Sequence, residues 1–155
     1  MEKKQFTKME DLSFLKERKK NKTLLSRIEM LKKRSGEEDE LLLCFYYCYG
    51  LGSVKIDKQE AEKRAISASQ NGNKLAAGMR YFYGWNKEKD YERANLCFNQ
   101  YLEESKSEEL RSYSLNMIGF IHYNGLIGKV DFKKAIEFYL KAVELGFIIF
   151  FFFKL

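Results

Sequence analysis

The sequence predicts an all-α fold, a right-handed α/α superhelix (a solenoid) built of helix–turn–helix repeats. Two observations carry this prediction. The 155 residues contain no proline, a residue that breaks helices by removing a hydrogen bond and clashing with the preceding turn. Asp57, Asp90 and Asp131 recur at intervals of 33 and 41 residues, and an alanine follows each of them four residues later. A period of roughly 30 to 45 residues is typical of stacked helical repeats.

The ends of the predicted helices are marked by the same residue types in each unit. The repeated aspartate stands at the start of each second helix, where its carboxylate can accept hydrogen bonds from free backbone N–H groups. A glycine ends each first helix, because glycine readily takes the left-handed conformation that terminates helices. These glycines are Gly50, Gly84 and Gly125. The predicted helices span 37–49, 57–71, 74–83, 90–104, 107–124 and 131–145.

A basic helical segment is predicted ahead of the repeats, over residues 1–36. Residues 1–34 hold 12 Lys and Arg against 5 Asp and Glu, whereas the rest of the chain holds 16 against 17. Thr7 and Glu10 fit a capping box, and Ser35 with Gly36 is expected to end the segment and to cap the next helix. Such positive charge can attract nucleic acid or an anionic membrane, although a solvated lysine-rich helix is the simpler interpretation.

Small residues within the predicted helices indicate close helix packing. Gly78 and Gly119 lie inside first helices, where glycine costs about 1 kcal/mol relative to alanine. We therefore expect a neighbouring helix to approach each of them closely, with alanines and aromatic side chains of the second helices filling the space. The positions expected to point inward on the first helices are Leu43, Tyr47, Gly78, Tyr81, Gly119 and His122.

The third unit carries the most complete motif, which reads Gly119-x-x-His122-x-x-Gly125, then Asp131-x-x-Lys-Ala135-x-x-Phe-Tyr139-x-Lys-Ala142-x-x-x-Gly146. This motif resembles the Sel-one-like repeat, a subfamily of the tetratricopeptide-like repeats. The resemblance covers about residues 37–146 and implies three units, at about 37–72, 73–106 and 107–146. The chain departs from the family pattern where Cys44 replaces a glycine, Asn86–Lys87 replaces glycine-valine and His122 replaces a tyrosine.

Neither catalysis nor metal or cofactor binding is expected. His122 is the sole histidine, and because it occupies a packing-tyrosine position of the family, we interpret it as structural. Cys44, Cys48 and Cys97 follow no pairing pattern and have no ligand cluster at metal spacing. A cysteine-rich branch of the family has been linked with β-lactam binding and hydrolysis. Its regularly paired cysteines are absent here, so a β-lactamase-like enzyme is only a remote alternative.

The apolar run at residues 147–155 departs from the polar cap that would begin a further repeat. It is too short to span a bilayer, which needs about 20 residues. Three interpretations stay open. The run is a truncated or altered end of the array, a cover for the open end of the last unit, or a weak anchor at a membrane surface.

The resemblance implies a protein–protein interaction module, an adaptor or scaffold with no small-molecule substrate, whose first helices line a concave binding face. Positions four and one before the turn glycines predict a partner-binding strip, because tyrosine and arginine are favoured in binding hot spots. The strip consists of Tyr46, Tyr49, Arg80 and Tyr83. Binding of nucleic acid or an anionic membrane through residues 1–36 is the alternative function. The start of the chain lacks the apolar stretch of a signal peptide, which favours a cytoplasmic location.

Overall fold

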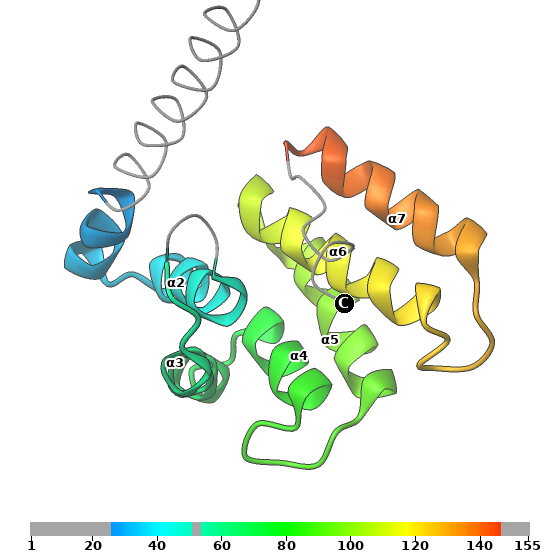
Figure 1. Ribbon diagram of the computed structural model, residues 1–155, viewed down its shortest axis with the longest axis horizontal. Helices are drawn as coiled ribbons and strands as arrows, with labels where there is room; N and C mark the ends of the chain where they lie inside the picture. The colour runs from blue at the N-terminus through cyan, green and yellow to red at the C-terminus, as the bar shows by residue number, and fades with distance from the viewer. Residues whose placement is uncertain (1–25, 51–53, 147–155) are drawn as a thin grey trace, which may run out of the picture. The chain divides into compact units, whose positions relative to one another are not determined.

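The computed structural model describes residues 26–50 and 54–146 (Figure 1). Residues 26–34 are helical, and no strand occurs within the described ranges. The helices that follow are α2 (Glu37–Tyr49), α3 (Lys58–Gln70), α4 (Lys74–Tyr83), α5 (Tyr91–Glu104), α6 (Glu108–Tyr123) and α7 (Phe132–Glu144). The predicted all-α class is confirmed, and each predicted helix end lies within one residue of the observed one. The capping box expected at Thr7 lies outside the described residues.

The chain divides into two compact units, Met1–Ala61 and Glu62–Leu155. In the first unit, the helical residues 26–34 bury Ile28 and Leu31, and α2 buries most of its length. In the second unit, α4 packs on α5, α5 on α6, and α6 on α7. Consecutive helices are therefore neighbours in space there, as helix–turn–helix units require.

One hydrogen-bond pattern closes the turn between the two helices of each of the three repeats. The amide of the repeated aspartate donates to the carbonyl oxygen of a residue near the end of the preceding helix. These bonds are Asp57 to Tyr47 (2.9 Å), Asp90 to Tyr81 (2.9 Å) and Asp131 to His122 (3.0 Å). The aspartate carboxylates accept from the amides of Glu60, Arg93 and Lys134 at 2.9–3.0 Å. The predicted N-caps are thus confirmed, and the turn glycines Gly50, Gly84 and Gly125 have the left-handed φ values of 61°, 72° and 61°.

The start of α2 corrects one expectation. Its N-cap is Gly36, whose amide donates to Asp39 Oδ2 at 3.1 Å, and Arg34 Nη2 lies 2.8 Å from Asp39 Oδ1. Ser35 was expected to cap this helix, and that expectation is wrong. An aspartate three residues further on reaches back to the free amide and takes over this role.

Glycine–aromatic contacts hold α4 against α5 and α6 against α7. A Cβ atom added to Gly78 would lie 2.5 Å from the ring of Phe98, and one added to Gly119 would lie 2.8 Å from the ring of Tyr139. Both rings are buried, and burial raises the pKa of Tyr139 to about 12. The close approach predicted at the two helical glycines is confirmed, and its partner in each pair is an aromatic ring of the following helix.

The inward-pointing positions are confirmed only in part. The buried ones are Leu43, Gly78, Gly119 and His122. Tyr47 and Tyr81 are half-buried, and the ring of each meets a lysine ammonium group. Lys32 Nζ lies 5.6 Å from the Tyr47 ring centroid, and Lys87 Nζ lies 3.9 Å from that of Tyr81. These two tyrosines therefore form cation–π contacts where complete core packing was expected.

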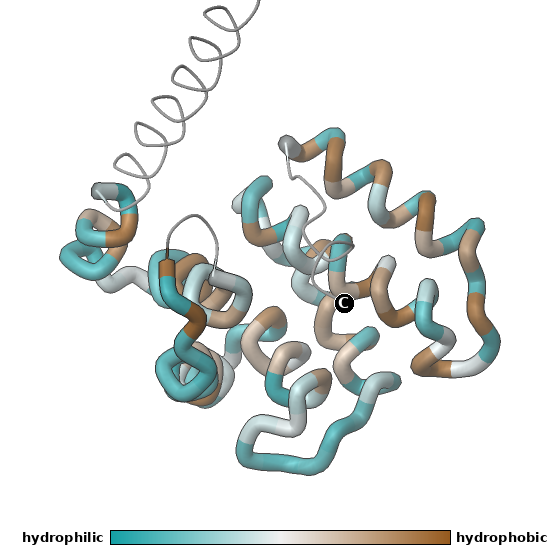
Figure 2. The backbone as a smooth tube through the Cα atoms, viewed as in Figure 1, coloured by the Kyte–Doolittle hydropathy of each residue, from teal (hydrophilic) through white to brown (hydrophobic). Residues whose placement is uncertain are grey.

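The hydropathy of the backbone alternates along α7, where apolar and polar stretches follow one another at each turn (Figure 2). One side of this helix is buried through Ala135, Tyr139 and Ala142.

Among the described residues, no helix combines the length and hydropathy needed to cross a membrane.

Candidate interaction surface

Three side chains at the end of α4 form a half-exposed group that we call the α4-end cluster: Arg80, Tyr83 and Trp85. The rings of Tyr83 and Trp85 stack with their centroids 4.7 Å apart and their planes at 23°. Arg80 Nε donates to the carbonyl oxygen of Trp85 at 3.3 Å, and its Nη1 donates to Ser69 Oγ at 3.0 Å. The amide of Trp85 donates in turn to the carbonyl of Arg80 at 3.1 Å. The guanidinium and both rings are therefore held in place before any ligand arrives.

The cluster contains two of the four residues predicted from the sequence, Arg80 and Tyr83, and one that sequence reasoning missed. Trp85 lies in the turn after Gly84, where the repeat pattern assigns no role. A signal was available, since Trp85 is the only tryptophan of the chain and tryptophan is enriched at binding hot spots.

The other two predicted residues lie on α2 and differ in exposure. Tyr46 is only 4% exposed, and its ring lies 6.0 Å from the guanidinium carbon of Arg27. Tyr49 is half-buried and stacks on Phe45 at 5.9 Å. Of these two tyrosines, Tyr49 therefore offers the larger accessible surface.

In the third repeat, the two positions equivalent to Arg80 and Tyr83 differ from each other in exposure. Ile121 is fully buried, whereas Asn124 is exposed and its side-chain amide donates to the carbonyl of Phe120 at 2.9 Å. The chemical character of these positions therefore changes from one unit to the next, although the backbone pattern repeats.

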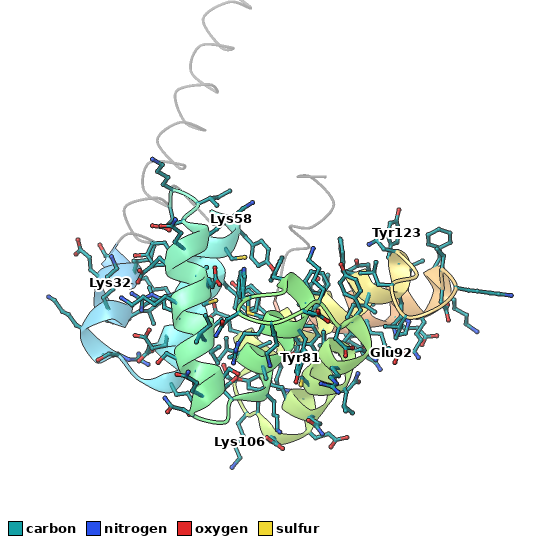
Figure 3. All side chains as sticks on the ribbon, turned by 90° about the horizontal axis from the view of Figure 1, so that it is seen from below. Lys32, Lys58, Tyr81, Glu92, Lys106 and Tyr123 are labelled. Carbon is teal, nitrogen blue, oxygen red and sulfur yellow. The ribbon has the colours of Figure 1, made fainter. Side chains whose placement is uncertain are left out.

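Tyr81, which is labelled in Figure 3, is half-buried, and its ring meets Lys87 of the α4–α5 turn and Arg93 of α5. The Arg93 guanidinium carbon is 5.7 Å from its ring centroid, and Lys87 approaches more closely. Hydrogen bonding to Arg93 and Lys87, together with the Lys87 charge, lowers the pKa of the Tyr81 phenol. Arg93 also pairs with Asp90 at 3.3 Å. The Arg93 side chain of α5 thus contacts both Tyr81, near the end of α4, and the capping aspartate of the second repeat.

Cys44 and Cys97 lie in different surroundings. Cys44 is buried, and its sulfur lies 3.2 Å from the carbonyl oxygen of Ala61, to which the thiol donates. Cys97 is half-buried, and burial raises the pKa of its thiol against the opposing charges of Lys74 and Lys87. Within residues 26–50 and 54–146, no three His, Cys, Asp or Glu side chains come together as metal ligands would.

His122 is 7% exposed and stacks on Phe138, with ring centroids 5.9 Å apart and planes at 10°. Its Nε2 is buried and has no hydrogen-bond partner among the described residues. Burial and, to a smaller extent, the Lys134 charge lower the pKa of His122, while Asp131 opposes them. The ring is therefore placed to remain neutral in the folded protein.

Acidification is expected to weaken the fold through His122. A lowered folded-state pKa means that the unfolded chain binds the proton more readily, so this residue's full stability is present above about pH 6.5 and falls as the pH drops through the folded pKa. Urea unfolding at pH 7.5 and pH 5.5 should show a larger loss for the wild type than for His122→Phe, which keeps a stacking ring. Equal losses in the two proteins would contradict the assignment.

The repeated turn bond, the capping aspartates and the glycine–aromatic contacts define a helical repeat protein. The family model of the Sel1 repeat matches residues 40–73, 73–100 and 112–147. These segments make up more than half of the chain, and the chain belongs to the Sel1 repeat family. Proteins of this family generally mediate protein–protein interactions and are generally not catalytic.

Two solved structures are similar to this chain. One is a protective antigen present in uropathogenic Escherichia coli strains and displaying an SLR fold, with 24% identity and a TM-score of 0.43 over 74% of this chain and 24% of that one. The other is a Sel1 repeat protein from Oxalobacter formigenes, with 21% identity and a TM-score of 0.46 over 77% of this chain and 49% of that one. The chain thus spans about a quarter and about half of these two proteins. No curated protein matches it.

Proposed function

We propose that this protein is an adaptor or scaffold that binds a protein partner through the first helices of its repeats, on the concave face that such arrays form. The observation that supports this most directly is the α4-end cluster, in which a stacked Tyr83–Trp85 pair lies beside the doubly hydrogen-bonded Arg80. Arginine, tyrosine and tryptophan are the residue types most enriched at binding hot spots.

The geometry of the cluster favours binding because its side chains are already ordered. Immobilising a flexible side chain at an interface costs about 0.5–1.5 kcal/mol. Two hydrogen bonds already hold Arg80, and the ring stack already holds Tyr83. Immobilising these two side chains on association therefore costs less than it would for flexible ones. On α2, the half-buried Tyr49 is more accessible to a partner than the buried Tyr46.

Replacing both Arg80 and Tyr83 with alanine is expected to abolish most partner capture by the full chain. Loss of a hot-spot residue costs about 2 kcal/mol or more, which corresponds to roughly a 30-fold weaker complex. The measurement is affinity capture from a cell lysate, with quantitative mass spectrometry of the bound proteins. Leu96→Ala serves as the control, since Leu96 is an exposed apolar residue of α5 outside the cluster. An unchanged set of captured proteins in the double variant would exclude this surface.

The basic N-terminal segment supports a second candidate, binding of nucleic acid or an anionic membrane. In its described part, Arg27 and Lys32 contact tyrosines of α2 and Arg34 pairs with Asp39, so three of its cations have partners within the first unit. Binding through this segment would weaken steeply with rising salt. Binding through the α4-end cluster would respond to Arg80→Ala with Tyr83→Ala at constant salt, which separates the two functions.

We further propose that the protein is cytoplasmic and has no chemistry of its own. Cys44, Cys48 and Cys97 follow no pairing pattern in the sequence, which fits a reducing compartment, where thiols stay reduced. The structural role of His122 leaves the chain's only histidine inside a packed helix pair. A β-lactamase-like activity would need the paired cysteines of the cysteine-rich branch, and the spacing of Cys44, Cys48 and Cys97 does not supply them.

A further inference from the structure

One side of α7 exposes a row of large apolar residues. We call it the α7 apolar face: Phe132, Ile136, Leu140 and Val143, which are 56%, 55%, 58% and 48% exposed. Their spacing of four, four and three residues places them in one row along the helix. Tyr123, labelled in Figure 3, packs edge-on against Phe132 with ring centroids 5.2 Å apart and widens the row at one end. Exposed apolar patches of this kind mark contact surfaces.

The packing of α7 within its own repeat uses a different side of the helix. Ala135, Tyr139 and Ala142 are buried, and the Tyr139 ring lies against Gly119 of α6. The α7 apolar face therefore takes no part in the contact that holds α6 against α7.

The preceding repeat shows that contact between neighbouring helices does not require such an apolar row. Aligning Asp131 with Asp90 pairs the α7 apolar face with four half-buried positions of α5, a helix that packs on both α4 and α6. These positions are Tyr91, Asn95, Asn99 and Leu102. Two of the four are amides, whereas all four residues of the α7 apolar face are hydrocarbon. This contrast indicates that the α7 apolar face meets an apolar surface of its own kind.

The spacing of the row is nearly the same in both directions along the helix. A two-fold axis through the middle of α7 relates one copy of the helix to a second, antiparallel one. Ile136 then faces Leu140 of the second copy, and Phe132 faces the neighbourhood of its Val143. The row is therefore complementary to itself, as the surface of a two-fold dimer must be.

The charged residues beside the row agree with the same axis. Lys133 and Glu144 are exposed and lie on one flank of the row, near its opposite ends. The two-fold axis brings Lys133 opposite Glu144 of the second copy, and Glu144 opposite its Lys133. Glu137 and Lys141 are also exposed but lie further round the helix. Two symmetric pairs of opposite charges thus favour an antiparallel partner and fix its register.

We propose that α7 pairs with α7 of a second copy of this chain, antiparallel, through the α7 apolar face. At the helical rise of about 1.5 Å per residue the contact is about 17 Å long, and it is about 10 Å wide. It is small beside the roughly 800 Å² that each partner contributes to a standard interface, so the dimer is weak and depends on concentration. The contact is separate from the α4-end cluster, which lies on another helix.

Sedimentation equilibrium of the full chain, from low micromolar to several hundred micromolar, measures this association. Leu140→Glu should weaken the dimer at least about tenfold, because it places a carboxylate in the middle of the apolar row. Leu96→Glu is the matched control, since Leu96 on α5 is also 58% exposed, and it should leave the association within twofold of the wild type. A wild type that stays monomeric over the whole range would overturn the proposal, as would a dimer that Leu140→Glu leaves unchanged.

Charge exchange tests the antiparallel register. Lys133→Glu and Glu144→Lys should each weaken self-association about fivefold, since each brings like charges together at both symmetric positions. An equimolar mixture of the two variants should associate as the wild type does, because the two acids of one copy then face the two lysines of the other. Single variants that associate like the wild type, or a mixture that stays as weak as its components, would contradict the antiparallel pairing.

Photo-crosslinking shows directly what covers the face. Val143 is replaced by benzoyl-phenylalanine, and a mixture of isotopically light and heavy full chains is irradiated at several hundred micromolar. The expected result is light-to-heavy crosslinks to residues near Phe132 of the second copy. Crosslinks confined to single chains would overturn the proposal and show that another segment of the same chain covers the face.

Discussion

Replacing Phe98 with alanine is expected to destabilise the protein by about 3–5 kcal/mol, the usual cost of removing a buried phenylalanine ring. Phe98 is fully buried on α5, and its ring fills the space above Gly78 on α4. The substitution leaves a cavity that the neighbouring backbone cannot close, because helices are too rigid to collapse into it. A loss of this size is a large part of the 5–15 kcal/mol that holds a typical domain folded.

Urea unfolding followed by circular dichroism at 222 nm measures this effect. Leu96→Ala is the matched control, since Leu96 lies two residues away on the same helix and is 58% exposed. Surface substitutions of this kind usually change stability by less than about 0.5 kcal/mol. Similar losses for the two variants would mean that the ring of Phe98 does not hold α4 and α5 together.

Replacing Gly119 with valine is expected to cost about 2–3 kcal/mol. The Cβ atom alone would lie 2.8–3.1 Å from three atoms of the Tyr139 ring, which is closer than carbon atoms normally approach, and the two valine methyl groups add to the conflict. Overpacking of this kind costs typically 1–3 kcal/mol. Valine is a better helix former than glycine by a few tenths of a kcal/mol, so the steric cost prevails.

A double-mutant cycle with Tyr139→Leu tests the origin of this cost. The shorter leucine side chain leaves room for the valine, so Gly119→Val should cost at least about 1 kcal/mol less in that background. Equilibrium unfolding of the four proteins gives the interaction energy. If the two costs simply add, the clash with Tyr139 is not the reason for the glycine.

The helix boundaries were predictable because they depend on residues close together in the chain. An aspartate at the N-cap and a glycine after the C-terminus act on neighbouring backbone groups, and Asp90 and Gly84 take these positions as predicted. The expected close approach at Gly78 also followed from sequence, because a helical glycine without a packing role would only weaken the helix. The turn bond from Asp90 to Tyr81 was not expected, since the pattern indicates which residues recur but not which carbonyl lies nearby.

The candidate surface was less predictable, because it depends on which side of a helix its neighbours leave open. Tyr46 and Arg80 occupy equivalent positions, yet Tyr46 is buried and Arg80 is half-exposed. Tyr81, expected in the core, instead meets Lys87 and Arg93 from the turn and the following helix. Such contacts join residues whose side-chain positions no local pattern fixes. The sequence therefore predicted the scaffold well and the exposure of individual side chains only in part.

The exchange of residue sizes between units shows why the backbone pattern survives changes in sequence. The position of Gly78 and Gly119 is taken by Cys44 in the first unit, and the position of Phe98 and Tyr139, eight residues after the repeated aspartate, is taken there by Ala65. A larger residue on the first helix thus accompanies a smaller one on the second. Volume-conserving exchanges of this kind are tolerated best in packed cores.

The affinity of one captured partner for the full chain shows whether a protein binds at the α4-end cluster. Isothermal titration calorimetry would compare the wild type with Arg80→Ala combined with Tyr83→Ala, and with Leu96→Ala as the control. We predict that the Kd of the double variant rises by roughly 30-fold or more, a change of about 2 kcal/mol, while that of Leu96→Ala stays within twofold. An unchanged Kd in the double variant, with its helical content intact, would contradict binding at the α4-end cluster.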